Sequence, residues 1–408
     1  MNYRFQKFTT IYPEFLQQFL AVNPGCEFWS YQELYERFTG TGYGLSNFFA
    51  QYMQALGHEA QDLFASFKVL QKAWARDNRV PYSERNWQKD IIKAQVRLFE
   101  PDVLFLQDLY LFNRAFREEL RAINSRKVLM IGWRGAPLPG FSGFEDLDLV
   151  LVPAPHFVTR LRHYGANAVL FPLGFEHTIL DVVHSQKERD LDLIFIGGLG
   201  ADTGPHSQRY ALIEKLLATT PLQVWGREGR YPGNEPLDKA IHQANRILRQ
   251  LGLPEWLMDR ARAMRRRLDR VRDRALPSLE QRYPGRVKSP VFGLDYFSLL
   301  ARAEITLNCH ADLAEDYAGN MRLFEATGMG ACLLTEWKKN LSDLFEPEVE
   351  VVAYCSVEEC IEKARYLLDH PRERQAIAAA GQRRTLRDHT FLRRVEQLDR
   401  LIRGSLEK

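Results

Sequence analysis

The chain has 408 residues, 45% hydrophobic and 26% charged, a composition typical of a globular protein with two or three domains. Its 55 basic and 52 acidic residues leave a net charge of +3, which is too small to drive binding to nucleic acid or to an acidic membrane. Basic residues are interspersed with acids and form no platform with aromatic residues, which also argues against nucleic-acid binding.

The cysteines and the amino-terminal segment indicate a cytoplasmic protein. The cysteines are odd in number, lie mostly in apolar runs and form no C-x-x-C pair, so we expect reduced thiols in the core and neither a zinc site nor a disulfide. They are Cys26, Cys309, Cys332, Cys355 and Cys360. Residues 1–24 lack the apolar core of a signal peptide, and no segment has the ~20 consecutive apolar residues that a membrane span needs.

The first 64 residues predict alternating strands and helices. Strands are expected at 5–11 and 60–64, and helices around 15–19, 31–38 and 45–56. Gly40, Gly42 and Gly44 precede the last of these helices. A glycine-rich turn before a helix can approach a ligand closely, and a flexible connector is the alternative.

A polar pair follows the next strand. The sequence predicts a helix at 83–100 and a fully buried strand at 103–106, followed by Gln107 and Asp108. The carboxyl end of a strand is where an α/β domain presents polar groups to a ligand. Asp108 is therefore a candidate general base or contact for an acceptor hydroxyl, and its alternative role is the N-cap of a helix at 111–120.

Three further strands complete a first domain, residues 1–172. They are expected at 127–132, 149–152 and 167–170, separated by helices, which predicts a parallel, doubly wound sheet. His156 begins one of these helices, either as a capping or packing residue or as a cleft residue. The domain boundary is expected near Pro172.

The second domain, residues 173–385, begins with a strand, a glycine-rich turn and a helix. The strand at 191–196 leads into Gly197, Gly198 and Gly200, and a helix begins near His206 and passes Arg209. Backbone N–H groups in such a turn can hold a phosphate. We therefore expect these three glycines to bind phosphate, with donor groups from His206 and Arg209.

A helical insert at residues 235–280 interrupts the α/β alternation. Apolar residues between 257 and 275 repeat at spacings of three and four, and residues 259–274 hold eight arginines and three aspartates. A basic amphipathic helix can lie on anionic lipid, which would place the protein peripherally at the inner membrane, or meet an acidic acceptor. The alternative is the solvated face of a helix hairpin.

A dense polar loop follows the strand expected at 305–307. It carries Asn308, His310, Asp312 and Asp316. His310 follows the strand's carboxyl end directly, so it can contact a bound sugar or stabilise a departing phosphate.

The helix after this loop has the features of a phosphate site. Asn320 is the expected N-cap of a helix that begins at Met321, and the free N–H groups there favour an anion. Arg322 and Glu325 lie three residues apart and share a face, where the guanidinium suits a diphosphate and the carboxylate suits ribose hydroxyls. An ordinary surface ion pair is the alternative.

The rest of the chain continues the alternation of strands and helices. We expect strands at 331–334 and 350–354, a helix at 357–369 and a last helix around 391–401.

The run NMRLFEATGMG at 320–330 resembles the E-A-x-x-x-G signature of two-domain GT-B glycosyltransferases, in particular the group 1 branch that includes CgeB-like spore maturation proteins. The likeness continues through 335–336, 340–341 and 344–346 and the tail at 379–385 with 389–390, and covers most of residues 100–395.

This resemblance implies two Rossmann-like domains that face a cleft, with the acceptor side in the first and the nucleotide-sugar site in the second. Glu325 would contact the ribose and nearby N–H groups the diphosphate, while residues 386–408 can cross back to the first domain. No D-x-D-type metal site is apparent, so we expect metal independence and no cofactor, with a glycan, lipid-linked or protein acceptor.

One position departs from the family pattern. Retaining members carry a second glutamate eight residues before the one that matches Glu325, and here that position is Tyr317. The resemblance therefore leaves inverting or retaining chemistry undecided. A catalytically silent nucleotide-sugar-binding protein of a surface or spore layer, and a nucleotide-sugar epimerase or phosphorylase on the same fold, remain alternatives.

Overall fold

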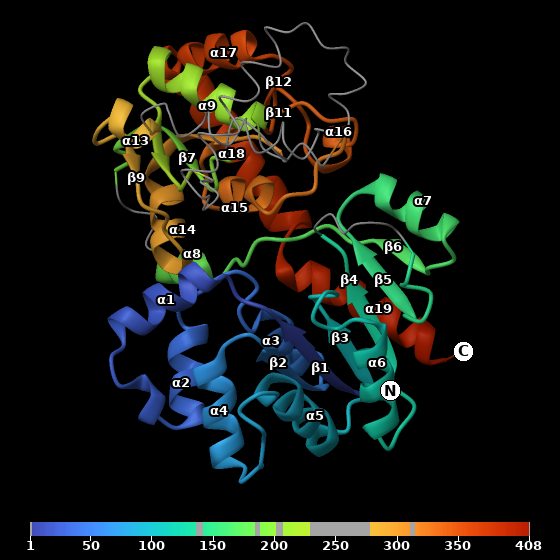
Figure 1. Ribbon diagram of the computed structural model, residues 1–408. Coiled ribbons are helices and arrows are strands. Elements are labelled where there is room, and N and C mark those ends of the chain that lie inside the picture. Colours follow the sequence, from blue (N-terminus) through green and yellow to red (C-terminus); the bar gives the residue numbers. More distant parts are fainter. Residues whose placement is uncertain are drawn as a thin grey trace, which may run out of the picture.

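The computed structural model describes residues 2–135, 142–183, 188–200, 207–228, 278–310 and 315–407. Two parallel six-stranded sheets with helices on their faces make up these residues (Figure 1). The strand order is β2-β1-β3-β4-β5-β6 in the first sheet and β12-β11-β10-β7-β8-β9 in the second. The predicted pair of doubly wound α/β sheets is therefore confirmed.

The strands of the first sheet are β1 Arg4–Thr9, β2 Glu59–Phe64, β3 Val103–Leu106, β4 Leu129–Trp133, β5 Leu149–Val152 and β6 Ala168–Leu170. Its helices are α1 Pro13–Val22, α2 Tyr31–Thr39, α3 Phe48–Ala55, α4 Lys68–Asp77, α5 Trp87–Phe99, α6 Arg114–Ile123 and α7 Pro155–His163, with the short 3-10 helix η1 Cys26–Phe28. A short helix, α8 Ile179–Val182, lies in the connection to the second sheet.

The strands of the second sheet are β7 Leu191–Ile196, β8 Gln223–Trp225, β9 Val287–Lys288, β10 Ala303–Asn308, β11 Cys332–Glu336 and β12 Val352–Tyr354. The helices that follow α8 are α9 Ser207–Thr219, α13 Leu279–Arg282, α14 Gly293–Arg302, α15 Arg322–Gly328, α16 Leu341–Leu344, α17 Val357–Asp369, α18 Pro371–Asp388 and α19 Phe391–Leu406. No helix among these is both long and apolar enough to cross a membrane.

Alternation of side chains along the strands builds a core on each face of each sheet. In the first sheet Phe8 and Leu104 lie in one apolar cluster, and Phe5 and Phe105 lie in the other. Successive residues of a strand point to opposite faces, so these short apolar strands are buried on both sides. The parallel register, Phe5 opposite Val103, then brings the carboxyl ends of β1 and β3 to the same edge.

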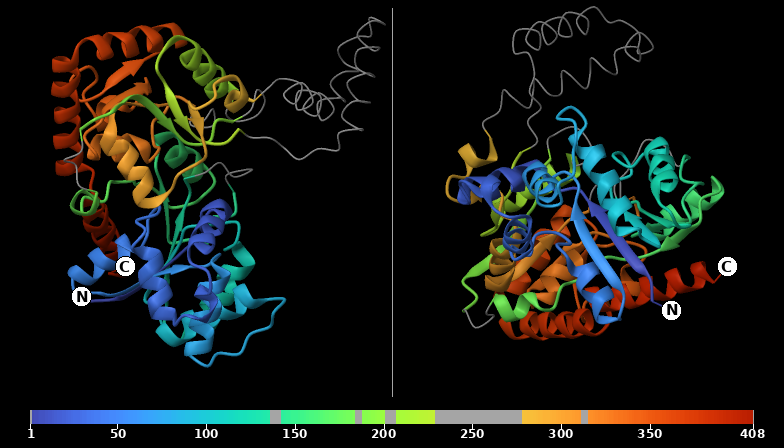
Figure 2. Two further views of the ribbon diagram at one scale, coloured as in Figure 1. Left: turned by 90° about the vertical axis from the view of Figure 1, so that its left-hand side faces the viewer. Right: turned by 90° about the horizontal axis from the view of Figure 1, so that it is seen from below.

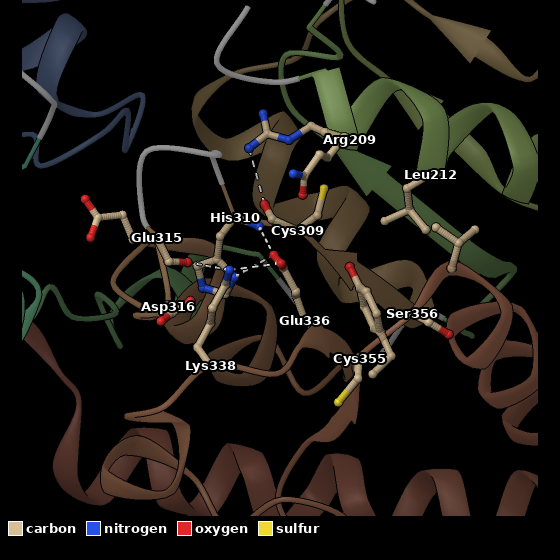
Figure 3. Close-up of a pocket in the computed structure, with 13 residues that line it drawn as sticks. Arg209, Leu212, Cys309, His310, Glu315, Asp316, Glu336, Lys338, Cys355 and Ser356 are labelled. Atoms are coloured by element: carbon tan, nitrogen blue, oxygen red, sulfur yellow. Dashed lines mark hydrogen bonds and ion pairs between the residues drawn. The ribbon is translucent and has the colours of Figure 1, made fainter.

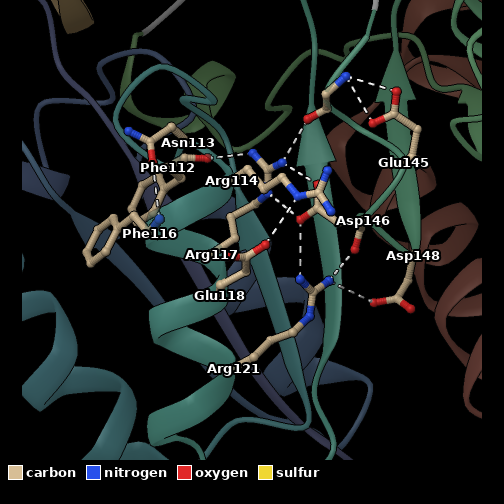
Figure 4. Close-up of polar contacts among 11 residues, drawn as sticks. Phe112, Asn113, Arg114, Phe116, Arg117, Glu118, Arg121, Glu145, Asp146 and Asp148 are labelled. Carbon is tan, nitrogen blue, oxygen red and sulfur yellow. Dashed lines mark hydrogen bonds and ion pairs between the residues drawn. The ribbon is translucent and has the colours of Figure 1, made fainter.

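A buried arginine organises the loop before β5 (Figure 4). Arg117 of α6 is 1% exposed; it donates from Nε to Asp146 at 2.8 Å and to the carbonyl oxygens of Phe112 and Gly143. Burial alone would raise the pKa of Asp146, but hydrogen bonds from Arg117 and Arg121 bring it below its usual value. A buried charge is tolerated only when paired in this way, so this cluster serves the fold.

The last helix leaves the second domain and packs on the first, as Figures 1 and 2 show. α18 contacts α15 and β11, whereas α19 contacts α3 and β4. Phe391, Val395 and Leu398 of α19 belong to the same apolar cluster as Phe5 and Phe49 of the first domain. The chain therefore crosses between the two sheets twice, once before β7 and once at α19.

Two expectations about local structure are wrong. Asp108 does not cap a helix at 111–120, because α6 begins at Arg114 and its N-cap is Asn113, whose side chain accepts from the Phe116 N–H. The cysteine expectation fails at Cys355, which is exposed at the end of β12 while the other four are buried. All five thiols are free, as predicted.

Candidate functional site

A cavity of about 660 Å³ lies between the two domains at the carboxyl ends of β7 and β8. Its described lining includes three arginines and two carboxylates, within walls that are otherwise largely apolar or glycine. The first domain supplies Tyr12, Glu14 and residues 42–44, and the second supplies Gly197, Gly198, Arg209, Arg227, Asn320, Arg322 and Glu325. Trp225, Pro290, Phe292 and Phe297 line it as well.

The glycine-rich turn after β7 forms one wall of this cavity. Gly197 has a φ of +151° and its N–H donates to the Trp225 carbonyl oxygen at 2.9 Å, which holds the turn against β8. A Cβ on Gly198 would meet no atom within 4 Å, so this residue borders open space. The predicted cradle of backbone groups is therefore open at Gly198, while Gly200, with a φ of +76°, forms a parallel bridge with Glu228.

Two arginines flank the turn on either side. Arg209 donates from Nη1 to the Gly198 carbonyl oxygen at 2.9 Å and from Nη2 to the Cys309 carbonyl oxygen at 3.3 Å. Arg322 donates to the Ile196 carbonyl oxygen and to Asn308 Oδ1 at 3.2 Å. Both guanidinium groups also lie over the Phe195 ring, 6.0 and 4.8 Å from its centroid. This turn is thus held between two fixed positive charges, which favour an anion.

Asn320 does not have the role expected for it. α15 begins at Arg322, and the N-cap position is held by Met321, which makes no side-chain cap. The Asn320 amide instead pairs with Asn308, accepting from its Nδ2 at 3.3 Å and donating to its Oδ1 at 2.6 Å. Since Asn308 also bonds Thr335, this amide network ties the start of α15 to β10 and β11.

Glu325 lies on α15 with its carboxylate at the cavity wall. The Tyr296 hydroxyl of α14 donates to Glu325 Oε2 at 2.7 Å. Burial raises the pKa of Glu325, and the hydrogen bond from Tyr296 and the charge of Arg322 act in the opposite direction. The alternative of an ordinary surface ion pair does not hold, because the carboxylate is partly buried and accepts a hydrogen bond from the Tyr296 phenol.

The first domain closes the cavity with the turn at 42–44. Gly42 and Gly44 have φ values of +63° and +61°, and a Cβ on Gly42 would lie 3.0 Å from Ile179 Cδ1. One residue earlier, the Thr41 carbonyl oxygen accepts from the Leu294 N–H of α14 at 2.9 Å. The turn is therefore bonded to the second domain at the cavity, which fits a ligand border better than a free connector.

A second cavity, of about 420 Å³, adjoins the first at Arg209 and contains His310 (Figure 3). The His310 imidazole is buried, and burial lowers its pKa. The His310 backbone N–H donates to Glu336 Oε2 at 3.2 Å, and Lys338 pairs with the other oxygen at 2.9 Å. Burial alone would raise the pKa of Glu336, but the His310 imidazole, whose Nδ1 lies 3.6 Å from Glu336 Oε2, and Lys338 lower it to about 2. His310 thus lines the neighbouring cavity instead of the first one.

Comparison with known proteins places the fold beside those of solved glycosyltransferases. Residues 209–400, just under half of the chain, match the family described as glycosyl transferase-like. Among solved structures, sucrose-phosphate synthase from Thermosynechococcus elongatus is 12% identical, with a TM-score of 0.55 and 100% of both chains covered. A glycosyltransferase from Rickettsia africae is 10% identical, with a TM-score of 0.56 over 100% of this chain and 99% of that one.

HepE from Anabaena, solved in complex with UDP-glucose, is 11% identical, with a TM-score of 0.56 over 99% of this chain and all of that one. No curated protein sequence matches the chain. The chain has the GT-B fold. In this GT-B protein the family match covers α15 and the following elements up to residue 400. The sequence resemblance was also expected for residues 100–208, but these residues lie outside the matched region.

Asp108 lies apart from both cavities of the GT-B cleft described above. Its carboxylate accepts from the backbone N–H groups of Tyr110 and Leu111, at 2.9 and 3.2 Å, and from the Thr10 hydroxyl at 3.0 Å. These donors hold the turn after β3 to the end of β1. These contacts therefore give Asp108 a structural role at the carboxyl edge of the first sheet.

Several expected features lie outside the described residues. They are His206, Asp312 and nearly all of the helical insert at 235–280, including the basic helix at 257–275.

Two polar residues at the cavity carried little signal in the sequence. Tyr296 is one of two aromatic residues in the amphipathic α14, and its hydrogen bond to Glu325 depends on how α14 packs beside α15. Glu14 lies in the first turn of α1, where a carboxylate is ordinary. Only the approach of the two domains places both at one site.

Proposed function

We propose that this protein transfers a glycosyl group from a nucleoside diphosphate sugar to an acceptor hydroxyl in the cavity between its domains. The observation that supports the proposal most directly is the cavity itself. It joins the open turn at Gly198, the guanidinium groups of Arg209 and Arg322 and the oriented carboxylate of Glu325.

Each part of such a donor has a matching group. The diphosphate would lie at the Gly198 turn, whose neighbouring arginines balance its charge and that of the departing nucleotide without a metal ion. The ribose hydroxyls would bind Glu325, which Tyr296 orients. The apolar wall of Trp225, Pro290 and Phe292 would hold the base. The sugar would extend toward Asn320 and the neighbouring His310.

The acceptor would approach from the first domain, and we propose a surface glycan, a lipid-linked sugar or a protein in the cytoplasm. Membership of the CgeB-like branch and contact with the inner membrane through residues 257–275 belong to this proposal. The main alternative is a silent nucleotide-sugar-binding protein, which Tyr317 favours because it replaces the glutamate of retaining members.

Ligand-induced thermal stabilisation tests the donor site. UDP is the first probe because HepE was solved with UDP-glucose, followed by GDP, TDP and ADP. A nucleotide at ~100 times its dissociation constant should add ~2.7 kcal/mol to the unfolding free energy. Glu325→Gln keeps an acceptor for the Tyr296 hydroxyl but removes the charge, so it should lose about 1.5–3 kcal/mol of nucleotide binding.

Glu362→Gln is the control, because Glu362 is exposed on α17 and lines neither cavity. If no diphosphate stabilises the wild type, the donor site proposed here is wrong. Release of nucleotide from a bound donor separates an enzyme from a silent binder, and release of an isomeric nucleotide sugar would indicate an epimerase.

A further inference from the structure

The two helices that form the Tyr296–Glu325 pair are joined at their far ends by one arginine. α14 carries Tyr296 and α15 carries Glu325, and the Tyr296 hydroxyl donates to Glu325 Oε2 at 2.7 Å. Arg189 lies just before β7, at the amino-terminal edge of the second sheet, whereas the cavity lies at the carboxyl edge. The arginine therefore contacts the donor site from behind, through the elements that build it.

The guanidinium group of Arg189 bridges the two helix ends through backbone carbonyl oxygens. At α14, Nη1 donates to the Leu300 carbonyl oxygen at 3.4 Å and to that of Ala303, where β10 begins. At α15, Nη2 donates to the Met329 carbonyl oxygen at 3.1 Å and to that of Gly330 at 2.7 Å. One planar group with fixed N–H directions thus sets the spacing of the two helix ends.

α15 depends on contacts at its ends because it is short. It has 7 residues, fewer than an isolated helix needs to be stable in water. At its carboxyl end Gly330, with a φ of +73°, turns the chain, and the Ala331 N–H donates to the Ala326 carbonyl oxygen at 3.0 Å. The carbonyl oxygens of Met329 and Gly330 need other donors, which Arg189 supplies. A cation is also the favourable charge at this end of a helix.

The surroundings of Arg189 shield these hydrogen bonds from water. Burial lowers the pKa of Arg189, and the charge of Glu304 acts in the opposite direction. Arg374 pairs with Glu304 at 3.1 Å, and these three side chains line a small cavity of about 160 Å³. An arginine keeps its charge in such a place, because its ordinary pKa lies far above neutral pH. A charged donor that is partly shielded forms stronger hydrogen bonds than one in water.

The carbonyl oxygens that Arg189 binds lie close to the Tyr296–Glu325 pair along each helix. Leu300 follows Tyr296 by four residues, and Met329 follows Glu325 by four residues. The Met329 N–H donates to the Glu325 carbonyl oxygen at 3.0 Å, which connects the two residues of α15 directly. Four residues of α-helix rise only about 6 Å, so a shift of either helix end would move one partner of the pair.

We propose that Arg189 is a positioning residue of the donor site, an inference that rests on the function proposed above. Arg189 does not line the donor cavity, so it acts through other residues. By fixing the carboxyl ends of α14 and α15 relative to each other, it keeps the Tyr296 hydroxyl on Glu325. The Glu325 carboxylate then stays oriented for the ribose hydroxyls before the nucleotide arrives.

A double-mutant cycle in the full-length protein tests whether Arg189 acts through this pair. Arg189→Met and Tyr296→Phe are made singly and together, and calorimetry measures UDP affinity at a temperature at which every variant is folded. Loss of the oriented carboxylate should weaken UDP binding about 10-fold in each single variant. The double variant should also lose about 10-fold and not about 100-fold, because both changes release the same carboxylate.

Arg302→Met is the matched control. Arg302 ends α14 in the same part of the domain, but it donates to the Asp190 carboxylate in a partly exposed pair. UDP affinity in this variant should equal that of the wild type. Arg189→Lys serves where Arg189→Met does not fold: it keeps the charge but lacks the planar fork, so it should weaken UDP binding in the same direction.

Hydrogen exchange without ligand gives a second measurement. Amides of residues 322–331 should exchange faster in Arg189→Met than in Arg302→Met, because α15 has lost donors at its carboxyl end. Losses that multiply in the cycle, or wild-type UDP affinity in a folded Arg189 variant, would overturn the positioning role. Faster exchange with unchanged affinity would do the same, since Arg189 would then order α15 without affecting the site. A wild type that binds no nucleoside diphosphate would refute the donor site, and the positioning role with it.

Discussion

At the scale of single residues, Gly226 sets the shape of the donor cavity. A Cβ at this position would lie 2.0 Å from the Gly197 carbonyl oxygen, a backbone atom that cannot give way without moving the turn. We expect Gly226→Ala to destabilise the protein by about 1–3 kcal/mol and to weaken nucleotide stabilisation. The control is Gly198→Ala in the turn after β7, where a Cβ meets nothing within 4 Å. The melting temperature of this variant without ligand should therefore equal that of the wild type. Equal melting temperatures for the two variants would contradict the close packing of these turns.

Glu336 makes the acid stability of the second domain testable. Its pKa falls from 4.5 to about 2 in the folded state, so the unfolded state binds more protons between these values and the protein loses stability as the pH falls through this window. The linkage is worth at most about 3 kcal/mol, reduced by screening of the partly exposed carboxylate. Urea unfolding between pH 5 and 3 should show a flatter dependence for Glu336→Gln than for the wild type. Glu362→Gln should keep the wild-type slope; an unchanged slope in Glu336→Gln would refute this assignment.

Residue patterns alone located much of the second-domain wall of the cavity. Gly197, Gly198, Arg209, Arg322 and Glu325 were expected from a turn signal and a shared helix face, and the structure brings them to one cavity. The role of Asn320 was missed, because the side chain that competes for it comes from a strand 12 residues earlier. Hydrogen bonds between side chains of different elements depend on how strands and helices pack, and residue spacing along the chain does not predict this packing.

At the scale of elements, the Asp399 carboxylate adds polar contacts to the apolar packing of α19 on the first domain. Asp399 accepts from the Tyr3 hydroxyl at 2.8 Å and from Arg403 Nε at 2.8 Å, and lies 3.0 Å from His58 Nε2. We expect Asp399→Asn to lower the unfolding free energy by about 1–3 kcal/mol, since buried partners lose a charged acceptor. Chemical denaturation of the variant and the wild type measures this difference in unfolding free energy. Glu396→Gln on the same helix breaks only a partly exposed pair with Arg393, so a similar loss there would contradict this role of Asp399.

Strands were predictable where they are short, apolar and buried on both faces. β3, β5 and β7 have the bounds expected from their apolar runs. β9 was missed because it has two residues, Val287 and Lys288, too few for any periodicity, and exists through its pairing with β8. The start of α15 was misplaced by one residue because its expected capping side chain bonds elsewhere.

At the scale of the whole molecule, the loop from Glu315 to Tyr317 joins the two domains beside the cleft. Arg160 of α7 donates to both oxygens of Glu315, at 2.6 and 2.8 Å, and His156 stacks on Tyr317. The ion pair is about 43% exposed and contributes little, whereas the stacked rings are shielded by the first domain's core. The ring of Tyr317 is therefore the stronger of these two contacts.

A glutamate at this position, as in the glycosyltransferases that the sequence resembles, tests that conclusion. Tyr317→Glu removes the ring from His156 and puts a carboxylate next to the acidic pair Glu315 and Asp316, so we expect a loss of about 1–3 kcal/mol in unfolding free energy. Small-angle scattering should show more separated domains. Tyr317→Phe keeps the stack and is expected to behave as the wild type. Equal unfolding free energies for Tyr317→Glu and Tyr317→Phe would contradict the role of the stacked ring in holding the two domains together.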